Sequence, residues 1–295
     1  MAERLEFRSR SPFEIHHILN GFKSLEEHSA YADLHIPDGE GPFGCVVAVH
    51  GSRGWSNHHE GHAQNWLKSG IAVCQLQHFS TRSVESVVED QLSVTHAMIL
   101  ADAFAVKEIL DADVRIGSIG IAGWSLGGTV ATYSAWSPII EVLGTPFDAH
   151  LSFYPATHLR PDVKKWSNAP MLILHGTGDD WTPIGLVEDL LPELPNVTLH
   201  TYQGAHHAFD STEDKRWLPK AIRLGKRTVR IEENGHMSGV WKFGIRVPMN
   251  ELRHRRFALW ILRNRGAHVM GDPIAREDAF QRGTAFLLSN LGLDS

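Results

Sequence analysis

The feature that most constrains this chain is the stretch Gly123-Trp124-Ser125-Leu126-Gly127, read with the residues on either side of it. A β-prone run precedes it at residues 115–122, and a small-residue stretch typical of a helix follows it at residues 128–136. Strand, G-x-S-x-G and helix in this order predict a nucleophile elbow, a sharp turn centred on the serine. Such a turn would hold the Ser125 hydroxyl at the edge of a sheet, at the partly positive N-terminus of a helix.

Length and composition predict one globular α/β domain over residues 1–295, since 42% of the residues are hydrophobic and 21% are charged. A formal net charge of −6 and the lack of a basic stripe argue against a nucleic-acid partner. We see no apolar run that could span a bilayer, and residues 1–8 lack the apolar core of a signal peptide. We therefore expect a cytoplasmic protein without a membrane partner. Cys45 and Cys74 fall in predicted buried strands, so we interpret both as core residues.

Strands alternate with helices from residue 43 to residue 202, which predicts a mostly parallel sheet with helices on both faces. The expected strands cover residues 29–36, 43–50, 71–76, 115–122, 149–155, 171–175 and 197–202. The expected helices cover residues 58–69, 84–110, 128–136, 184–191 and 272–288. Residues 1–28 are expected to wrap the outside of the fold. The pattern changes over residues 211–248, which predicts an excursion near the active site.

Within this excursion, residues 223–231 and 240–245 predict a β-hairpin around Asn234-Gly235.

A serine hydroxyl needs a base to accept its proton, and the base needs a carboxylate to orient it. In a parallel sheet these partners lie in loops at the carboxyl ends of later strands, in the order serine, acid, histidine. Two loops that follow predicted strands, residues 175–183 and 202–210, contain the required residue types. The first holds Asp179 and Asp180, and the second holds His206 and His207.

Five stretches in this order resemble the dienelactone hydrolase-like family of the α/β-hydrolase superfamily, over about residues 43–210. They are His50-Gly51-Ser52-Arg53-Gly54, Arg115-Ile116-Gly117, Gly123-Trp124-Ser125-Leu126-Gly127-Gly128, His175-Gly176-Thr177-Gly178-Asp179 and Gly204-Ala205-His206-His207-Ala208-Phe209. The resemblance implies an α/β-hydrolase fold with Asp179 as the acid and His207 as the base. Asp180 and His206 are then expected to be solvated or supporting neighbours.

An oxyanion hole needs two backbone N–H groups directed at the developing negative oxygen. Leu126, the residue after the nucleophile, supplies one of them. The resemblance implies that Ser52 supplies the other, with Arg53 as the alternative. Because the donor belongs to the main chain, either side chain would serve.

Two positions depart from the family pattern. Dienelactone hydrolase itself has a cysteine nucleophile where this chain has Ser125, which favours general ester hydrolysis over that one reaction. The strand at 71–76 runs into Gln77-His78-Phe79, where the family commonly has an acidic residue. Arg82 lies near the place where the resembling enzyme holds an arginine that binds a substrate carboxylate, so we consider that role against an ordinary surface arginine.

The run His58-His59-Glu60-Gly61-His62 offers a histidine pair at i, i+4 spacing, but it misses the H-E-x-x-H pattern by one residue. We interpret these histidines as solvated residues at the start of a helix, one of which could still line the pocket. We expect no metal and no cofactor. Trp55, Trp124 and Trp181 each flank a candidate loop and, with Arg53, are candidate substrate contacts in a largely apolar pocket.

The sequence therefore predicts a serine hydrolase that cleaves a small or medium carboxylic ester or lactone through an acyl-enzyme. Two alternatives remain open: a peptidase of the prolyl-oligopeptidase type, and a non-catalytic binding protein on the same fold. The expected partner is the small-molecule substrate, and a homodimer stays open.

Overall fold

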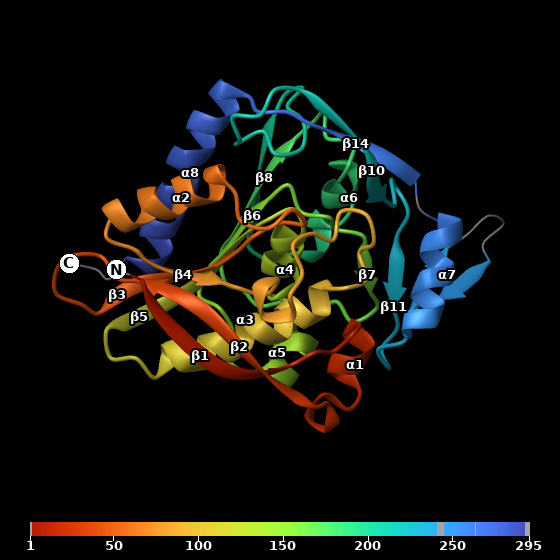
Figure 1. The fold of residues 1–295 in the computed structure, drawn as a ribbon, viewed down its shortest axis with the longest axis horizontal. Coiled ribbons are helices and arrows are strands. Elements are labelled where there is room, and N and C mark those ends of the chain that lie inside the picture. The colour runs from red at the N-terminus through yellow and green to blue at the C-terminus, as the bar shows by residue number, and fades with distance from the viewer. Residues whose placement is uncertain (1, 241–244, 263, 293–295) are drawn as a thin grey trace.

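An eight-stranded sheet forms the centre of the computed structural model, which describes residues 2–240, 245–262 and 264–292 (Figure 1). The strand order is β1-β2-β4-β3-β5-β6-β8-β9. Strands β4 to β9 in this order are parallel, whereas β1 pairs with β2, and β2 with β4, in antiparallel fashion. The strands are β1 (Glu3–Arg10), β2 (Glu27–His35), β3 (Phe43–Val49), β4 (Ala72–Leu76), β5 (Ile116–Trp124), β6 (His150–Phe153), β8 (Met171–Gly176) and β9 (Val197–Tyr202).

Helices cover both faces of this sheet. Successive side chains of β3 alternate between two cores: Val47 packs in the cluster that includes helices α3 and α4, and Val46 in the cluster that includes α2 and α8. This continuous apolar pattern is the one expected of a strand buried on both faces. The helices are α1 (Ile15–Leu19), α2 (Asn57–Lys68), α3 (His96–Asp111), α4 (Leu126–Tyr133), α5 (Ser137–Leu143), α6 (Gly185–Glu188) and α8 (Pro273–Leu291), with short 3₁₀ turns at Phe22–Ser24, Ser80–Arg82 and Leu191–Glu193.

A second layer of short strands, which we call the outer layer, lies beyond the carboxyl ends of the central strands (Figure 1). One small sheet has the order β13-β12-β11-β7, and another pairs β10 with β14. The helix α7 (Leu252–Leu262) joins the two. The strands are β7 (Leu159–Pro161), β10 (Arg216–Arg223), β11 (Val229–Ile231), β12 (Met237–Val240), β13 (Arg246–Pro248) and β14 (Asn264–Val269).

The predicted central strands and the mostly parallel sheet are confirmed, and so is the final helix that begins after Asp272. The predicted hairpin around Asn234-Gly235 is present, but its strands are the shorter β11 and β12. Of its second predicted strand, residues 241–244 lie outside the described residues. Cys45 and Cys74 are buried and unpaired. Within the described ranges we find no helix with the length and apolarity needed to cross a membrane.

The helix predicted for residues 84–110 is wrong in its first half. Helix α3 begins at His96, because Thr95 caps it by accepting a hydrogen bond from the Met98 N–H at 3.3 Å. Residues 84–95 form turns instead, and residues 1–28 contribute β1 to the sheet edge as well as wrapping it. The strand β1 is antiparallel and half exposed, so its pattern differs from that of the buried parallel strands.

Candidate active site

Ser125 lies at the turn between β5 and α4 with φ 54° and ψ −109°, a conformation that non-glycine residues rarely adopt. The Ser125 N–H donates to the Phe153 carbonyl at 2.9 Å, which holds the turn against β6. The flanking glycines are required by close contacts. A Cβ on Gly123 would lie 2.1 Å from the Gly127 carbonyl oxygen, and one on Gly127 would lie 2.0 Å from that of Val49. This strained turn is the geometry of a nucleophile elbow.

Hydrogen bonds connect Ser125, His207 and Asp179 in one line. His207 Nε2 lies 2.9 Å from Ser125 Oγ, and His207 Nδ1 lies 2.7 Å from Asp179 Oδ2. His207 and Asp179 are both buried. A serine, a base within hydrogen-bond reach and a carboxylate that orients the base are the elements of a nucleophilic hydrolase site.

The Asp179 carboxylate is held by the loop after β8. Its Oδ1 accepts the N–H groups of Trp181 at 2.8 Å and Thr182 at 2.9 Å, and its Oδ2 accepts the Thr182 hydroxyl at 2.9 Å. Burial acts to raise the pKa of Asp179, but the charge of protonated His207 and these hydrogen bonds hold the pKa below its ordinary value. Asp179 is therefore ionised at neutral pH. The sequence reasoning missed Thr182, although its place three residues after the acid is typical of a capping hydroxyl.

The neighbouring candidates point away from this line. Asp180 accepts the N–H of His268 and contacts its Nδ1, both at 2.9 Å, on β14. His206 Nε2 lies 3.0 Å from the exposed Lys215 Nζ. Asp180 thus connects the loop that contains Asp179 to β14, and the His206 ring lies near the surface.

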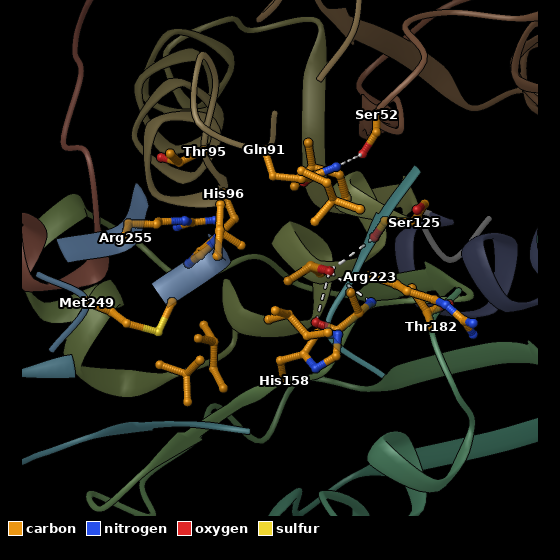
Figure 2. A pocket seen from close by; sticks show the side chains of 18 of the residues that line it. Ser52, Gln91, Thr95, His96, Ser125, His158, Thr182, Arg223, Met249 and Arg255 are labelled. Atoms are coloured by element: carbon orange, nitrogen blue, oxygen red, sulfur yellow. Dashed lines mark hydrogen bonds between the residues drawn. The ribbon is translucent and has the colours of Figure 1, made fainter. Parts of the chain in front are cut away.

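Ser52 and Leu126 line one cavity together with Ser125 (Figure 2). Among the described residues, neither backbone N–H donates a backbone hydrogen bond. The Ser52 loop is fixed from the other side, because its carbonyl accepts the Val87 N–H at 3.0 Å and its hydroxyl accepts Gln91 Nε2 at 3.3 Å. Residues 84–95, which were expected to be helical, therefore support the Ser52 loop instead. No local sequence pattern predicts this contact.

Two cavities meet at Ser125. The main cavity encloses about 110 Å³ and extends from Ser125 toward His96 and Arg255 beneath the outer layer (Figure 2). The smaller one encloses about 40 Å³, and His207 and Arg53 line it. The outer layer contributes to the main cavity through Ile222, Arg223, Leu224, Val229, Met237, Met249 and Leu259.

The sequence model of the dienelactone hydrolase family matches residues 34–229. The chain belongs to this family. A curated relative, a probable 2-oxo-3-(5-oxofuran-2-ylidene)propanoate lactonase from Bradyrhizobium sp, is 27% identical over 151 residues, which are 48% of this chain and 60% of the relative. A crystal structure assigned as a dienelactone hydrolase from Klebsiella pneumoniae superposes with a TM-score of 0.56 at 16% identity, covering 97% of this chain and 98% of that one. This likeness shows the α/β-hydrolase fold.

Of the residues predicted to contact substrate, some line a cavity at Ser125 and others do not. Trp181 lines both cavities, and Trp124 and Arg53 line the smaller one, although the Arg53 guanidinium also pairs with Glu213 at 2.7 Å. Trp55 lines neither of the two cavities among the described residues; it packs edge-on against His50, with ring centroids 5.2 Å apart.

The substrate-binding role considered for Arg82 needs correction, and so does its alternative of an ordinary surface residue. Its guanidinium forms a buried ion pair with Asp102 at 2.5 Å and also donates to the His78 carbonyl at 3.1 Å. Arg82 lines neither of the two cavities among the described residues, because this pair fastens it to α3 beneath β1. The position thus serves packing in this chain.

The interpretation of the histidine run as solvated is also wrong, whereas the expectation that one of them could line the pocket agrees with the lining of the smaller cavity, which includes His58 and His59. His59 and His62 are buried on α2, and His62 Nε2 lies 3.1 Å from Asp210 Oδ2. His58 Nε2 lies 4.0 Å from Asp210 Oδ1. Over the described ranges, no group of three or more His, Cys, Asp or Glu side chains is arranged to hold a metal ion.

Asp210 is the centre of this buried cluster and was missed from the sequence. Its Oδ1 accepts the Tyr154 hydroxyl at 2.8 Å, and its Oδ2 accepts the Trp124 Nε1–H at 2.9 Å. Burial acts to raise its pKa, but the histidines and these hydrogen bonds lower it to about 2. Asp210 thus links α2 to the residues before Ser125 and after β6.

Proposed function

We propose that the chain is a carboxylic ester hydrolase that cleaves a small or medium ester or lactone through an acyl-enzyme on Ser125. The observation that carries the proposal is the unbroken line from Ser125 Oγ to His207 at 2.9 Å and on to Asp179 at 2.7 Å. Family membership supports it, because the dienelactone hydrolase family comprises hydrolases of carboxylic esters and lactones. The lactonase relative supports the same reaction class.

In the first half of the reaction, Ser125 Oγ attacks the carbonyl carbon while His207 Nε2 accepts the hydroxyl proton. Asp179 remains ionised, accepts the His207 Nδ1–H and stabilises the positive charge on the ring. The N–H groups of Leu126 and Ser52 hold the oxyanion of the tetrahedral intermediate. The intermediate collapses when His207 returns the proton to the leaving alkoxide, which departs as the alcohol.

In the second half, water takes the place of the alcohol. His207 removes a proton from the water as its oxygen attacks the acyl carbon, and the same two N–H groups hold the new oxyanion. Collapse returns the proton to Ser125 Oγ and releases the carboxylic acid. The nucleophile, the general base, its orienting carboxylate and the oxyanion donors in this scheme are all groups of the chain itself.

The test combines active-site labelling with one substitution. A fluorophosphonate probe should label Ser125, and Ser125→Ala should lower the turnover of a chromogenic ester on the order of a million-fold. Ser118→Ala is the matched control, because Ser118 lies earlier on the same strand β5 and outside both cavities. Labelling of a different serine, with turnover retained in Ser125→Ala, would contradict the proposal.

A further inference from the structure

The main cavity has a largely apolar lining and a polar far end. The lining includes apolar side chains such as Val94, Leu159, Val229 and Leu259, together with the polar Gln91 and His158. At one end lies Ser125, and at the other lie His96 and Arg255 (Figure 2). Apolar walls with a few convergent polar groups are typical of a small-molecule site.

Three polar side chains from segments distant in the sequence meet at the far end: Glu14 and His96 are buried, and Arg255 is partly buried. Glu14 is fully buried, and its Oε1 accepts a hydrogen bond from Arg255 Nη1. His96 Nε2 lies 3.8 Å from Glu14 Oε2, too far for a hydrogen bond. Together they form a polar cluster that we call the distal triplet: Glu14, His96 and Arg255.

Each member of the distal triplet has a buried atom without a hydrogen-bond partner among the described residues. These atoms are Glu14 Oε2, His96 Nε2 and Arg255 Nε. A buried polar atom left unpaired costs about 1–3 kcal/mol, so three in one place call for an explanation. The side chains of His96 and Arg255 line the cavity, whereas Glu14 is absent from its described lining, so a polar group of a bound molecule would meet His96 and Arg255.

The charges of the distal triplet indicate which polar group fits. Glu14 and Arg255 cancel each other, and burial lowers the pKa of His96 to about 3, so its ring is neutral at pH 7. Of the two members that line the cavity, Arg255 can only donate, and the Nε2 of the neutral His96 ring donates or accepts according to its tautomer. A neutral group that both donates and accepts satisfies them, whereas a carboxylate would face Glu14 and an ammonium group would face Arg255.

The position of His207 indicates which part of the substrate enters. His207 must protonate the leaving alcohol, and it lines the smaller cavity. The main cavity is lined by Ser125, Leu126 and Ser52, and His207 is absent from its described lining. The leaving group therefore belongs on the side of the smaller cavity, and the acyl group enters the main one.

We propose that the main cavity binds an acyl chain with an apolar middle and a terminal neutral hydroxyl or carboxamide, which the distal triplet recognises. This inference rests on the proposed function and specifies its substrate class. Recognition at the far end would orient the carbonyl at Ser125, so it would act on kcat/KM.

A matched ester series tests the inference. Its members are p-nitrophenyl esters of increasing acyl length, each with a methyl, ω-hydroxyl or ω-carboxylate end, so the leaving group stays constant. At one acyl length we expect the ω-hydroxyl ester to exceed its methyl counterpart in kcat/KM by about tenfold, the effect of one buried hydrogen bond. The ω-carboxylate ester should fall below both.

Variants then assign the preference to the distal triplet. His96→Phe and the charge-balanced double variant Glu14→Gln/Arg255→Met should each reduce the ratio of ω-hydroxyl to methyl ester toward one. Met249→Leu, on the wall of the same cavity, should retain the ratio. Thermal unfolding shows which variants fold, and His96→Phe keeps the test decisive if the double variant does not.

Two outcomes separate this inference from the proposed function. Equal kcat/KM for hydroxyl and methyl esters at every length, in an enzyme that needs Ser125, would overturn only the inference and would leave the triplet to a structural water. Turnover of the methyl esters by Ser125→Ala would overturn the proposed function instead.

Discussion

Asp179 and Asp210 lie in the loops after β8 and β9, and they resemble each other closely. Both side chains are fully buried, and each lies within hydrogen-bond distance of a histidine: Asp179 of His207 at 2.7 Å and Asp210 of His62 at 3.1 Å. In both, burial acts to raise the pKa, yet protonated histidine and hydrogen bonds hold the pKa below its ordinary value. Burial and a lowered pKa therefore do not distinguish the proposed catalytic acid from its neighbour.

The two differ in what the second nitrogen of the histidine meets. His207 Nε2 reaches Ser125 Oγ at a cavity, so a proton can pass to a substrate. His62 Nδ1 has no partner among the described residues, and its ring stacks on Phe280 with centroids 3.7 Å apart. The Asp179–His207 pair ends at Ser125, whereas the Asp210–His62 pair ends in the core. His58, which also faces Asp210, lines the smaller cavity, but no hydrogen bond among the described residues joins it to Ser125. We conclude that the far end of such a pair, and not the acid itself, indicates function.

The largest expected effect concerns catalysis. Asp179→Asn should lower kcat by about ten-thousand-fold, because an amide cannot hold the His207 tautomer or stabilise its charged form. Turnover of a chromogenic ester measures it. Asp180→Asn is the matched control and should stay far closer to the unmodified enzyme, since Asp180 contacts His268 instead. The reverse ranking would contradict the assignment of the acid.

The second expected effect concerns stability. Asp210→Asn should lower the free energy of unfolding by about 3 kcal/mol or more, because it leaves buried donors and histidines around a neutral amide. Urea denaturation measures this loss. Asp162→Asn is the control, because Asp162 forms a half-exposed ion pair with Arg230 and should cost about 1 kcal/mol or less.

Asp210→Asn should keep far more activity than Asp179→Asn. If it lost as much turnover while remaining as stable as the unmodified chain, Asp210 would also be part of the catalytic machinery, and the two carboxylates would not differ in role.

The third expected effect is the pH dependence of that stability. The pKa of Asp210 falls from 3.8 to about 2 on folding, so its ionised form stabilises the fold above pH 4. This contribution, about 2 kcal/mol, should be lost as the pH falls from about 4 to about 2. His58 and His62 face Asp210 and have lowered pKa values from burial, so their protonation in acid works in the same direction.

Free energies of unfolding for the unmodified chain and Asp210→Asn, measured across this range, check the prediction. The two curves should converge as the pH falls. Parallel curves would show that Asp210 does not titrate with a lowered pKa.

The difference between Asp179 and Asp210 also shows what a single sequence can predict. Ser125, Asp179 and His207 could be predicted as candidates that lie together, because each lies in a short local motif after a strand and parallel strands bring their carboxyl ends together. Asp210 follows His207 by three residues, yet its role depends on Tyr154 and α2, which the chain order does not connect to it.

The same limit applies to two further features that depend on contacts between distant segments. Residues 84–95 have a helix-like composition, but their contacts with Ser52 replace the helix. The distal triplet joins residues 14, 96 and 255, which carry no shared motif. Contacts between distant segments decide these features, and a single sequence does not show which segments come into contact.

The smallest expected effect concerns metal. His58 and His62 face the Asp210 carboxylate, but no group of three such side chains among the described residues is arranged to hold an ion. The carboxylate already accepts the Tyr154 hydroxyl at 2.8 Å and the Trp124 Nε1–H at 2.9 Å. An ion there would have to displace both donors, one of which, Trp124, directly precedes Ser125. If the cluster is structural, exhaustive chelation should leave ester turnover within about twofold, because the proposed triad needs no Lewis acid. Turnover that falls on chelation and returns with added zinc would instead make Asp210 part of the catalytic site. The contrast between Asp179 and Asp210 would then be lost, because both carboxylates would belong to the catalytic site.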